Sequence, residues 1–301
     1  MEHDSALNLT FIGFGEAAQA FVSRMTRSGV TIHTYDVKVA GASASTVRAA
    51  AQVAQVVCHD HLTEAVQSAD VVWSLVTADQ AFAAATAVAE QIKPGALFLD
   101  GNSCAPHTKQ AAAHIITQAG GRYVDVAVMS PVLPLRNRTP LLLSGPHADE
   151  TQALLTELGM NATVEPGPVG TASSIKMVRS IMVKGMEALF AECTLAGRLA
   201  GVDQQVFASL DASNPGFNWA ERAAYNLERM TLHGERRAAE MEEVCAFLSH
   251  LGLPERMSET TVRWQRRLAQ SGVQASADDY QAPADALLKH FNLPNDQEKT
   301  S

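Results

Sequence analysis

The sequence lacks the features of several protein classes. Its four cysteines are far apart and none lies in a C-x-x-C pair, which argues against a disulfide framework or a cysteine-based metal site. No run of about 18 apolar residues is present, and the first residues do not have the pattern of a signal peptide. Positive charge is also scarce. The formal net charge of −9 disfavours nucleic acid or an anionic membrane as the main partner. We therefore expect a cytoplasmic protein.

The first half of the chain alternates two patterns. Of its 301 residues, 47% are hydrophobic and 18% charged, enough apolar residues for a large core. Between alanine-rich stretches of helical length lie short apolar runs, at residues 9–15, 31–36, 71–77, 97–103, 122–130 and 140–146. Strands that alternate with helices are typical of a parallel sheet with helices on both faces. We predict an α/β Rossmann-type domain with a parallel sheet over residues 1–168.

The pattern changes near Gly170, after a segment at 164–170 with two prolines and two glycines. Residues 170–202 contain no proline and no strand signal, and their apolar residues recur at helical spacing, at Ile175, Val178, Met182, Met186, Leu189 and Cys193. They predict one helix of about 30 residues, about 45 Å long. Further helical segments are expected at 202–211, 217–232, 234–252 and 259–272. We predict an all-helical substrate and dimerisation domain over residues 169–301, with a frayed polar tail after Pro283.

A glycine motif follows the first apolar run. Residues 13–18, Gly13-Phe14-Gly15-Glu16-Ala17-Ala18, fit G-x-G-x-x-G/A. The first glycine allows a tight turn, the second lets a pyrophosphate approach the backbone, and the third position must be small so that the helix packs on the strand. The start of the helix then offers free N–H groups to phosphates. We predict that residues 13–17 bind a dinucleotide.

An acid stands where the ribose of such a cofactor is expected. Asp36 ends the second apolar run, 21 residues after Gly15, and a carboxylate there binds ribose hydroxyls. The same carboxylate repels a 2′-phosphate, so we expect NAD rather than NADP, although Lys38 and Arg48 keep NADP open. Val76 and Thr77, at the end of the 71–77 run, are further predicted cofactor contacts.

A second group of polar residues ends the 97–103 run. Asn102 and Ser103 follow a strand at the carboxyl edge of the predicted sheet, where open α/β sheets bind ligands. They are candidates for holding a substrate carboxylate or hydroxyl. A turn that caps the next helix explains the same two residues equally well.

Lys176 lies in the first turns of the predicted long helix. It shares a helical face with Arg179, Ser180, Val183 and Glu187. A lysine that faces a cleft can take a proton from a hydroxyl group as hydride leaves the same carbon. The alternative is a surface lysine on an amphipathic helix. Lys184, for comparison, is expected to pair with Glu187.

In this order, the glycine motif, Asp36, "DGNS" and "GTASSIKMV" resemble the β-hydroxyacid dehydrogenases, which include 3-hydroxyisobutyrate and 6-phosphogluconate dehydrogenases. The resemblance covers residues 8–262. It implies NAD binding at the glycine motif, substrate binding at Asn102 and Ser103, and Lys176 as the catalytic lysine that shuttles the hydroxyl proton. The family is usually dimeric or tetrameric, and its domain order matches the order expected here.

The sequence also departs from the family. Ser180 stands where members usually carry an asparagine, and it is preceded by Arg179. The glycine-rich substrate loop is replaced by residues 128–140, with three prolines and two candidate anion-binding residues, Arg136 and Arg138. The usual lysine–aspartate pair of the later helix is replaced by His233, Arg236, Arg237 and Glu240. This pattern resembles a phosphogluconate-dehydrogenase-like subgroup with a divergent C-terminal domain.

The leading hypothesis is an NAD-dependent dehydrogenase acting on a small anionic β-hydroxy acid or related alcohol. Lys176 takes the hydroxyl proton, Asn102 and Ser103 hold the substrate together with Ser180, and Arg179 or Arg237 replaces the missing amide. Two alternatives stay open: an NADPH-dependent keto or imine reductase, and a dinucleotide-binding regulator without catalysis. The long apolar helix also predicts a homodimer or homotetramer.

Overall fold

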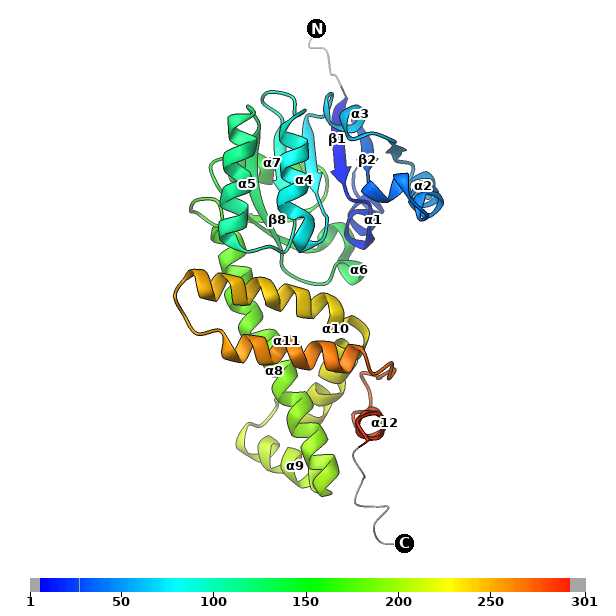
Figure 1. Ribbon diagram of the computed structural model, residues 1–301, viewed down its shortest axis with the longest axis vertical. Coiled ribbons are helices and arrows are strands. Elements are labelled where there is room, and N and C mark those ends of the chain that lie inside the picture. The colour runs from blue at the N-terminus through cyan, green and yellow to red at the C-terminus, as the bar shows by residue number, and fades with distance from the viewer. Residues whose placement is uncertain (1–5, 27, 293–301) are drawn as a thin grey trace. The chain divides into compact units, whose positions relative to one another are not determined.

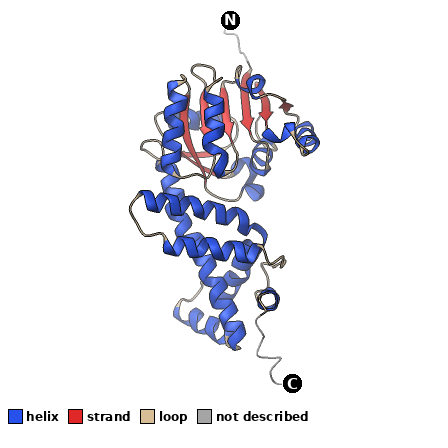
Figure 2. Cartoon of the chain, viewed as in Figure 1, coloured by secondary structure: helices blue, strands red, loops and turns tan. Residues whose placement is uncertain are grey.

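The computed structural model describes residues 6–26 and 28–292. The chain divides into two compact units, the first ending at Met177 and the second beginning at Val178 (Figure 1). Among the described residues every named strand lies in the first unit, and the second unit is helical apart from one isolated bridge between Ser276 and Asp279 (Figure 2).

The first unit is built on one sheet of eight strands in the order β3-β2-β1-β4-β5-β6-β7-β8. The strands are β1 (Leu7–Ile12), β2 (Val30–Tyr35), β3 (Val57–Cys58), β4 (Val71–Ser74), β5 (Leu97–Asp100), β6 (Arg122–Val128), β7 (Pro140–Ser144) and β8 (Asn161–Val164). Every neighbouring pair is parallel except β6–β7. The carboxyl ends of β1, β2, β4, β5 and β6 therefore meet at one edge.

Helices cover both faces of this sheet. They are α1 (Glu16–Val22), α2 (Ala44–Val53), α3 (Leu62–Val66), α4 (Ala81–Ala89), α5 (Pro106–Gln118), α6 (Val132–Leu135) and α7 (Ala148–Glu157). One buried cluster joins the sheet to α1, α2, α6 and α7, and a second joins it to α3, α4 and α5. Figure 1 shows α4 and α5 side by side on one face. Burial on both faces explains why the strands read as nearly continuous apolar runs.

The predicted Rossmann-type fold is confirmed, with three differences. Two strands were not predicted: β3 has two residues and β8 has four, too short for a periodic signal. The sheet is also not wholly parallel. Residues 129–139, between β6 and β7, hold only α6 and a short 3₁₀ turn, and a parallel neighbour needs a crossover of about a dozen or more residues.

The second unit consists of helices. α8 (Thr171–Ala200) begins in the first unit and matches the predicted 30-residue helix, and it is followed by α9 (Asp203–Ser213), α10 (Trp219–His250), α11 (Arg256–Ala269) and α12 (Gln281–His290). No helix of the described residues is both long and apolar enough to cross a membrane. The segments expected at 217–232 and 234–252 form the single helix α10. Gly234 lies within this helix and does not interrupt it. A Cβ there would lie 2.3 Å from the backbone oxygen of Gln265, so the glycine allows α11 to pack closely.

The predicted frayed tail is wrong as far as residue 292. Pro283 lies in the first turn of α12, where its missing N–H costs nothing, and Leu287 and Leu288 of that helix are buried. The remainder of the predicted tail lies outside the described residues.

The apolar residues of α8 that reveal its helical period are largely exposed. The exposed fractions of Ile175, Val178, Met182, Met186 and Leu189 lie between 37% and 64%. The buried side of the same helix carries Phe190, Ala191 and Leu195, which join the core of the second unit. α8 therefore presents an apolar stripe to solvent as well as a core-facing side.

Ion pairs join α8 to α10 within the second unit. Arg237 donates to Glu187 through Nε (2.9 Å) and Nη2, and Gln265 donates to the same carboxylate (2.7 Å). Lys184 pairs with Glu240 (2.9 Å) and not with Glu187, so the pairing expected from helical spacing is wrong. Glu187 is instead bound by Arg237 of α10, and Lys184 contacts Glu240 of the same helix.

The pair between Glu187 and Arg237 gives a stability prediction. Only 3% and 11% of the two side chains are exposed, so Arg237→Met leaves a buried carboxylate without its cation. We expect it to lower the free energy of unfolding by about 3–5 kcal/mol, and Glu187→Gln combined with it to recover part of this loss. Urea denaturation measures both.

The control is Arg266→Met, which removes the exposed pair with Glu242 and is expected to change the stability by about 0–1 kcal/mol. Equal effects of Arg237→Met and Arg266→Met would contradict the buried role of Arg237.

Candidate functional site

The turn between β1 and α1 has the backbone that the glycine motif requires. Gly13 has a φ of +85°, and a Cβ there would lie 2.6 Å from the backbone oxygen of Leu75. A Cβ on Gly15 would meet nothing within 4 Å. The first glycine therefore lets β1 turn against the segment after β4, and the second leaves the space that a pyrophosphate needs.

Asp36 follows β2, and its carboxylate reaches this turn. Its Oδ2 accepts a hydrogen bond from the backbone N–H of Phe14 (2.9 Å), and Oδ1 accepts one from the N–H of Lys38 (2.9 Å). The acid is thus beside the glycine turn, as its spacing indicates, and its contact with ribose hydroxyls stays a prediction. Arg48, one of the two cations that keep NADP open, forms a surface ion pair with Asp60 (2.6 Å).

Asn102 ties the end of β5 to the end of β4. Its Oδ1 accepts a hydrogen bond from the N–H of Val76 (2.6 Å), and its Nδ2 donates to Ser74 (2.9 Å) and to Asp100 (2.8 Å). The side chain is buried and both amide hydrogens have partners inside the protein. Asn102 therefore shapes this edge directly, and its predicted contact with substrate would have to use the remaining lone pair of Oδ1. Thr77, a predicted cofactor contact, is exposed at the same edge.

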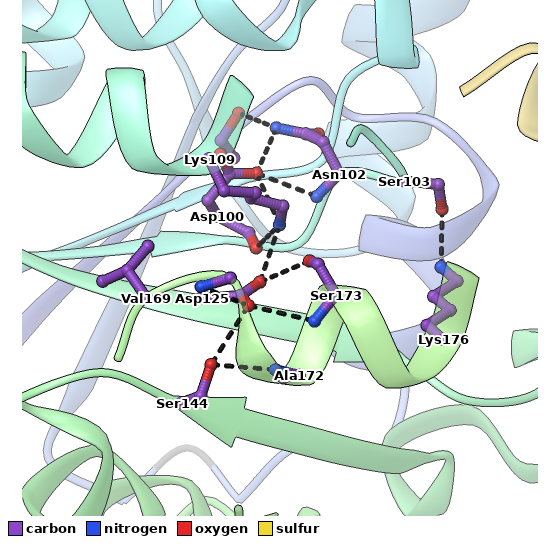
Figure 3. A network of polar contacts seen from close by, with 12 residues as sticks. Asp100, Asn102, Ser103, Lys109, Asp125, Ser144, Val169, Ala172, Ser173 and Lys176 are labelled. Carbon is purple, nitrogen blue, oxygen red and sulfur yellow. Dashed lines mark hydrogen bonds and ion pairs between the residues drawn. The ribbon is translucent and has the colours of Figure 1, made fainter. Parts of the chain in front are cut away.

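Lys176 and Ser103 are brought together. The Nζ of Lys176 donates a hydrogen bond to the Oγ of Ser103 over 2.6 Å, although 73 residues separate them (Figure 3). Lys176 lies in the second turn of α8 and Ser103 in the loop after β5, and both side chains are partly exposed. The arrangement places an amine and a hydroxyl at the carboxyl edge of the sheet, next to the loop that Asn102 holds. Such a pair suits proton transfer to or from a bound alcohol.

Beneath this pair lies a buried ionic cluster that the sequence analysis missed. Lys109 of α5 is fully buried, and its Nζ lies 3.1 Å from Oδ1 of Asp100 and 3.3 Å from Oδ1 of Asp125. Tyr123 donates to the other oxygen of Asp100 (2.6 Å). A carboxylate inside an apolar strand, as in "YVDVAV", was the available signal, because an acid is buried only when it is paired.

The charge states of this cluster follow from its surroundings. Burial alone disfavours an ammonium, but Asp100 and Asp125 outweigh it and raise the pKa of Lys109 above its usual value. Burial and the neighbouring Asp100 carboxylate raise the pKa of Tyr123 well above its usual value. At neutral pH Lys109 is therefore a cation and Tyr123 is a neutral donor.

Asp125 also fixes the start of α8. Its Oδ2 accepts hydrogen bonds from the N–H groups of Gly170 (3.1 Å) and Ser173 (3.0 Å), and its Oδ1 accepts one from the Ser173 hydroxyl (2.6 Å). Ser144 of β7 donates to the same carboxylate and accepts from the N–H of Ala172 (Figure 3). A carboxylate at a helix N-terminus satisfies free N–H groups and is favoured by the helix dipole.

The other predicted substrate residues lie in the second unit. Arg237 is bound by Glu187, as described above. Ser180 is buried and accepts a hydrogen bond from Lys184 (3.0 Å). Arg179 is exposed on α8. Of the three, Arg179 has the side chain best suited to meet an anion from solvent.

The loop of residues 128–140 forms a small hollow. Arg136 and Arg138 line it with Arg24 and residues 133–135, and its volume is about 230 Å³. Arg136 has a φ of +53°, which non-glycine residues seldom adopt. The predicted anion-binding role of the two arginines stays a prediction. Within residues 6–26 and 28–292, no group of three or more His, Cys, Asp or Glu side chains could hold a metal ion.

Two family models match the chain. Residues 8–167 match the NAD binding domain of 6-phosphogluconate dehydrogenase, and residues 198–268 match a domain of unknown function, DUF1932. The first model covers the glycine turn, Asp36 and the loop with Ser103. The second covers α9, α10 and most of α11, including His233, Arg236, Arg237 and Glu240.

Known proteins are similar to this chain over most of its length. A conserved hypothetical protein from Sinorhizobium meliloti 1021 is 33% identical, with a TM-score of 0.77 over 95% of this chain and 97% of that one. The 2-(hydroxymethyl)glutarate dehydrogenase of Eubacterium barkeri is 21% identical over 77% of this chain and 76% of its own.

More distant structures share the fold. The 3-hydroxyisobutyrate dehydrogenase of Mycobacterium tuberculosis, solved with L-serine, is 14% identical with a TM-score of 0.74 over 93% of this chain and 99% of its own. An imine reductase of Myxococcus stipitatus, solved with NADP⁺, is 18% identical with a TM-score of 0.54 over the same shares. The family models and the fold together establish that this chain belongs to the β-hydroxyacid dehydrogenase family.

Proposed function

We propose that the protein is an NAD-dependent dehydrogenase that transfers hydride between the CH–OH carbon of a small anionic β-hydroxy acid, or a related alcohol, and NAD. The observation that carries the proposal is the 2.6 Å hydrogen bond between Lys176 and Ser103 at the carboxyl edge of an NAD-binding domain. An amine held beside a hydroxyl at this edge is suited to move the proton of a substrate hydroxyl.

The residues around the glycine turn fit a dinucleotide. The open space at Gly15 would take the pyrophosphate, and the Asp36 carboxylate beside Phe14 would bind the ribose hydroxyls. A bound NAD supplies the acceptor for hydride. A carboxylate at this point disfavours a 2′-phosphate, and Arg48 is engaged by Asp60, so the proposal specifies NAD rather than NADP.

In the proposed mechanism Lys176 holds and moves the proton. Its neutral amine accepts the proton of the substrate hydroxyl at Nζ as the carbon loses hydride, and the ammonium returns the proton in the reverse direction. Ser103 orients Nζ through the hydrogen bond and offers its hydroxyl to the substrate. Arg179, one helical turn after Lys176 and exposed, is our candidate for binding the substrate anion.

Replacing Lys176 tests the proton transfer. With a panel of β-hydroxy acids and NAD, Lys176→Met is expected to lower kcat by about 10²–10⁴-fold while NADH affinity is unchanged, because general acid–base catalysis contributes about that much. Lys93→Met, which removes an exposed pair with Asp70, is the matched control and should keep full activity. Turnover that survives Lys176→Met would refute the proton shuttle.

The cofactor is tested by fluorescence titration with NADH and NADPH. We expect tighter binding of NADH, and a loss of about tenfold or more in Asp36→Asn, because a hydrogen bond to a charged group is lost. Asp60→Asn, at an exposed acid, should leave NADH affinity unchanged. Preference of the unmodified protein for NADPH would instead favour a keto or imine reductase. Tight NADH binding without turnover on any alcohol would favour a regulator without catalysis.

We also propose that the exposed stripe of α8 is covered by a second copy of this chain. Five apolar side chains spaced three or four residues apart form a seam of the kind that packs against another helix. Met182→Glu is expected to convert dimers or tetramers into monomers in light scattering at micromolar concentration, whereas Val53→Glu, at an 87% exposed residue of α2, should not. An unmodified protein that is monomeric would contradict the proposal.

A further inference from the structure

Lys109 is a fully buried cation in the first unit, and the proposed mechanism does not use it. Its Nζ donates to the backbone oxygen of Asp100 (2.5 Å) and lies within 3.3 Å of carboxylate oxygens of Asp100 and Asp125. Burying three charged groups is unfavourable unless they compensate one another. Figure 3 shows the ammonium between the two acids. Asp100 is the last residue of β5, and Asp125 lies within β6. One side chain therefore links two neighbouring strands where the site begins.

The Asp100 arm of this cluster leads to Ser103. The Oδ1 of Asp100 accepts hydrogen bonds from the backbone N–H of Asn102 (3.0 Å) and from its side-chain amide (2.8 Å). Asn102 is the residue before Ser103. The carboxylate thus fixes the loop that presents the hydroxyl.

The Asp125 arm leads to Lys176. Its two oxygens accept three hydrogen bonds from Gly170 and Ser173, at the start of α8. Lys176 follows Ser173 by three residues, about one helical turn. The carboxylate thus fixes the helix turn that carries the amine.

We propose that Lys109 is a positioning residue: by holding Asp100 and Asp125 at a fixed separation, it holds the hydroxyl of Ser103 within hydrogen-bond reach of the amine of Lys176. The inference deepens the proposed function, because it concerns the amine proposed to carry the proton. The contact between Ser103 and Lys176 itself is measurable without any substrate.

The test is the acetylation rate of Lys176 by a trace of acetic anhydride, followed against pH by mass spectrometry of its peptide. The hydrogen bond to Ser103 stabilises the ammonium, so its loss increases the reactive neutral amine. Ser103→Ala, which removes the acceptor alone, is expected to raise the rate near neutral pH by about two- to tenfold. The exposed amine of Lys93 in the same sample is the internal reference.

Lys109→Met is expected to raise the Lys176 rate toward that of Ser103→Ala. Lys109→Arg, which keeps the charge, should raise it less. The matched control is Thr10→Val, which removes a buried hydrogen bond from β1 to the backbone oxygen of Ala65 in α3 (2.6 Å) and lowers stability without touching the cluster. It should leave the Lys176 rate unchanged. A Lys176 rate in folded Lys109→Met equal to that of the unmodified protein would overturn the proposal.

Two further variants decide the question if Lys109→Met does not fold. Lys109→Met with Asp125→Asn removes one charge of each sign together, and Ser173→Ala removes one hydrogen bond of the Asp125 arm. Either variant, folded by circular dichroism, supports the proposal if Lys176 reacts faster and overturns it if the rate is unchanged. These results stand apart from the proposed function, whose failure would appear as turnover by Lys176→Met.

Discussion

The first unit depends on the compensation of charge inside its core. Lys109, Asp100 and Asp125 are almost completely excluded from water, and each would be strongly unfavourable alone. Because the two acids belong to neighbouring strands and the lysine to the helix that packs on them, β5, β6 and α5 must assemble together before the charges are paired. The loop after β5 and the first turn of α8 are bonded to the same carboxylates. The polar site is therefore an extension of the core and not an addition to its surface.

Local signals predicted the part of the fold that local physics determines. The glycine turn needs a positive φ at Gly13, and the helical spacing of apolar residues in α8 extends over 30 consecutive residues. Both features can therefore be predicted from the sequence. The reversed strand β7 and the short strands β3 and β8 depend on which strand lies beside them. Gly234 shows the same limit. As a glycine between two apolar segments it suggests a break, and only the backbone of α11 reveals why a side chain is excluded there.

The site divides along the same line. The resemblance to the β-hydroxyacid dehydrogenases named Lys176 and Ser103, and the fold brings them into contact. The resemblance does not tell which polar side chains already form hydrogen bonds or ion pairs with neighbouring residues. Asn102 and Arg237 are each bound by partners far away in sequence or on another helix, so their availability to a ligand is decided by packing. The role of Lys109 is not visible in the sequence for a related reason, because its two partners come from separate strands.

The reversal of β7 has a consequence for how the segment between β6 and β7 can vary. Because β6 ends and β7 begins at the same edge, with the N–H of Met129 bonded to the carbonyl of Pro140, residues 130–139 leave and re-enter the sheet at one place. An excursion closed by its own backbone pairing can be lengthened, shortened or exchanged without altering strand order. In this chain the excursion carries two arginines, Arg136 and Arg138, and two prolines, Pro131 and Pro134. It is a place where loop length and charge can change while the eight-stranded sheet keeps its order.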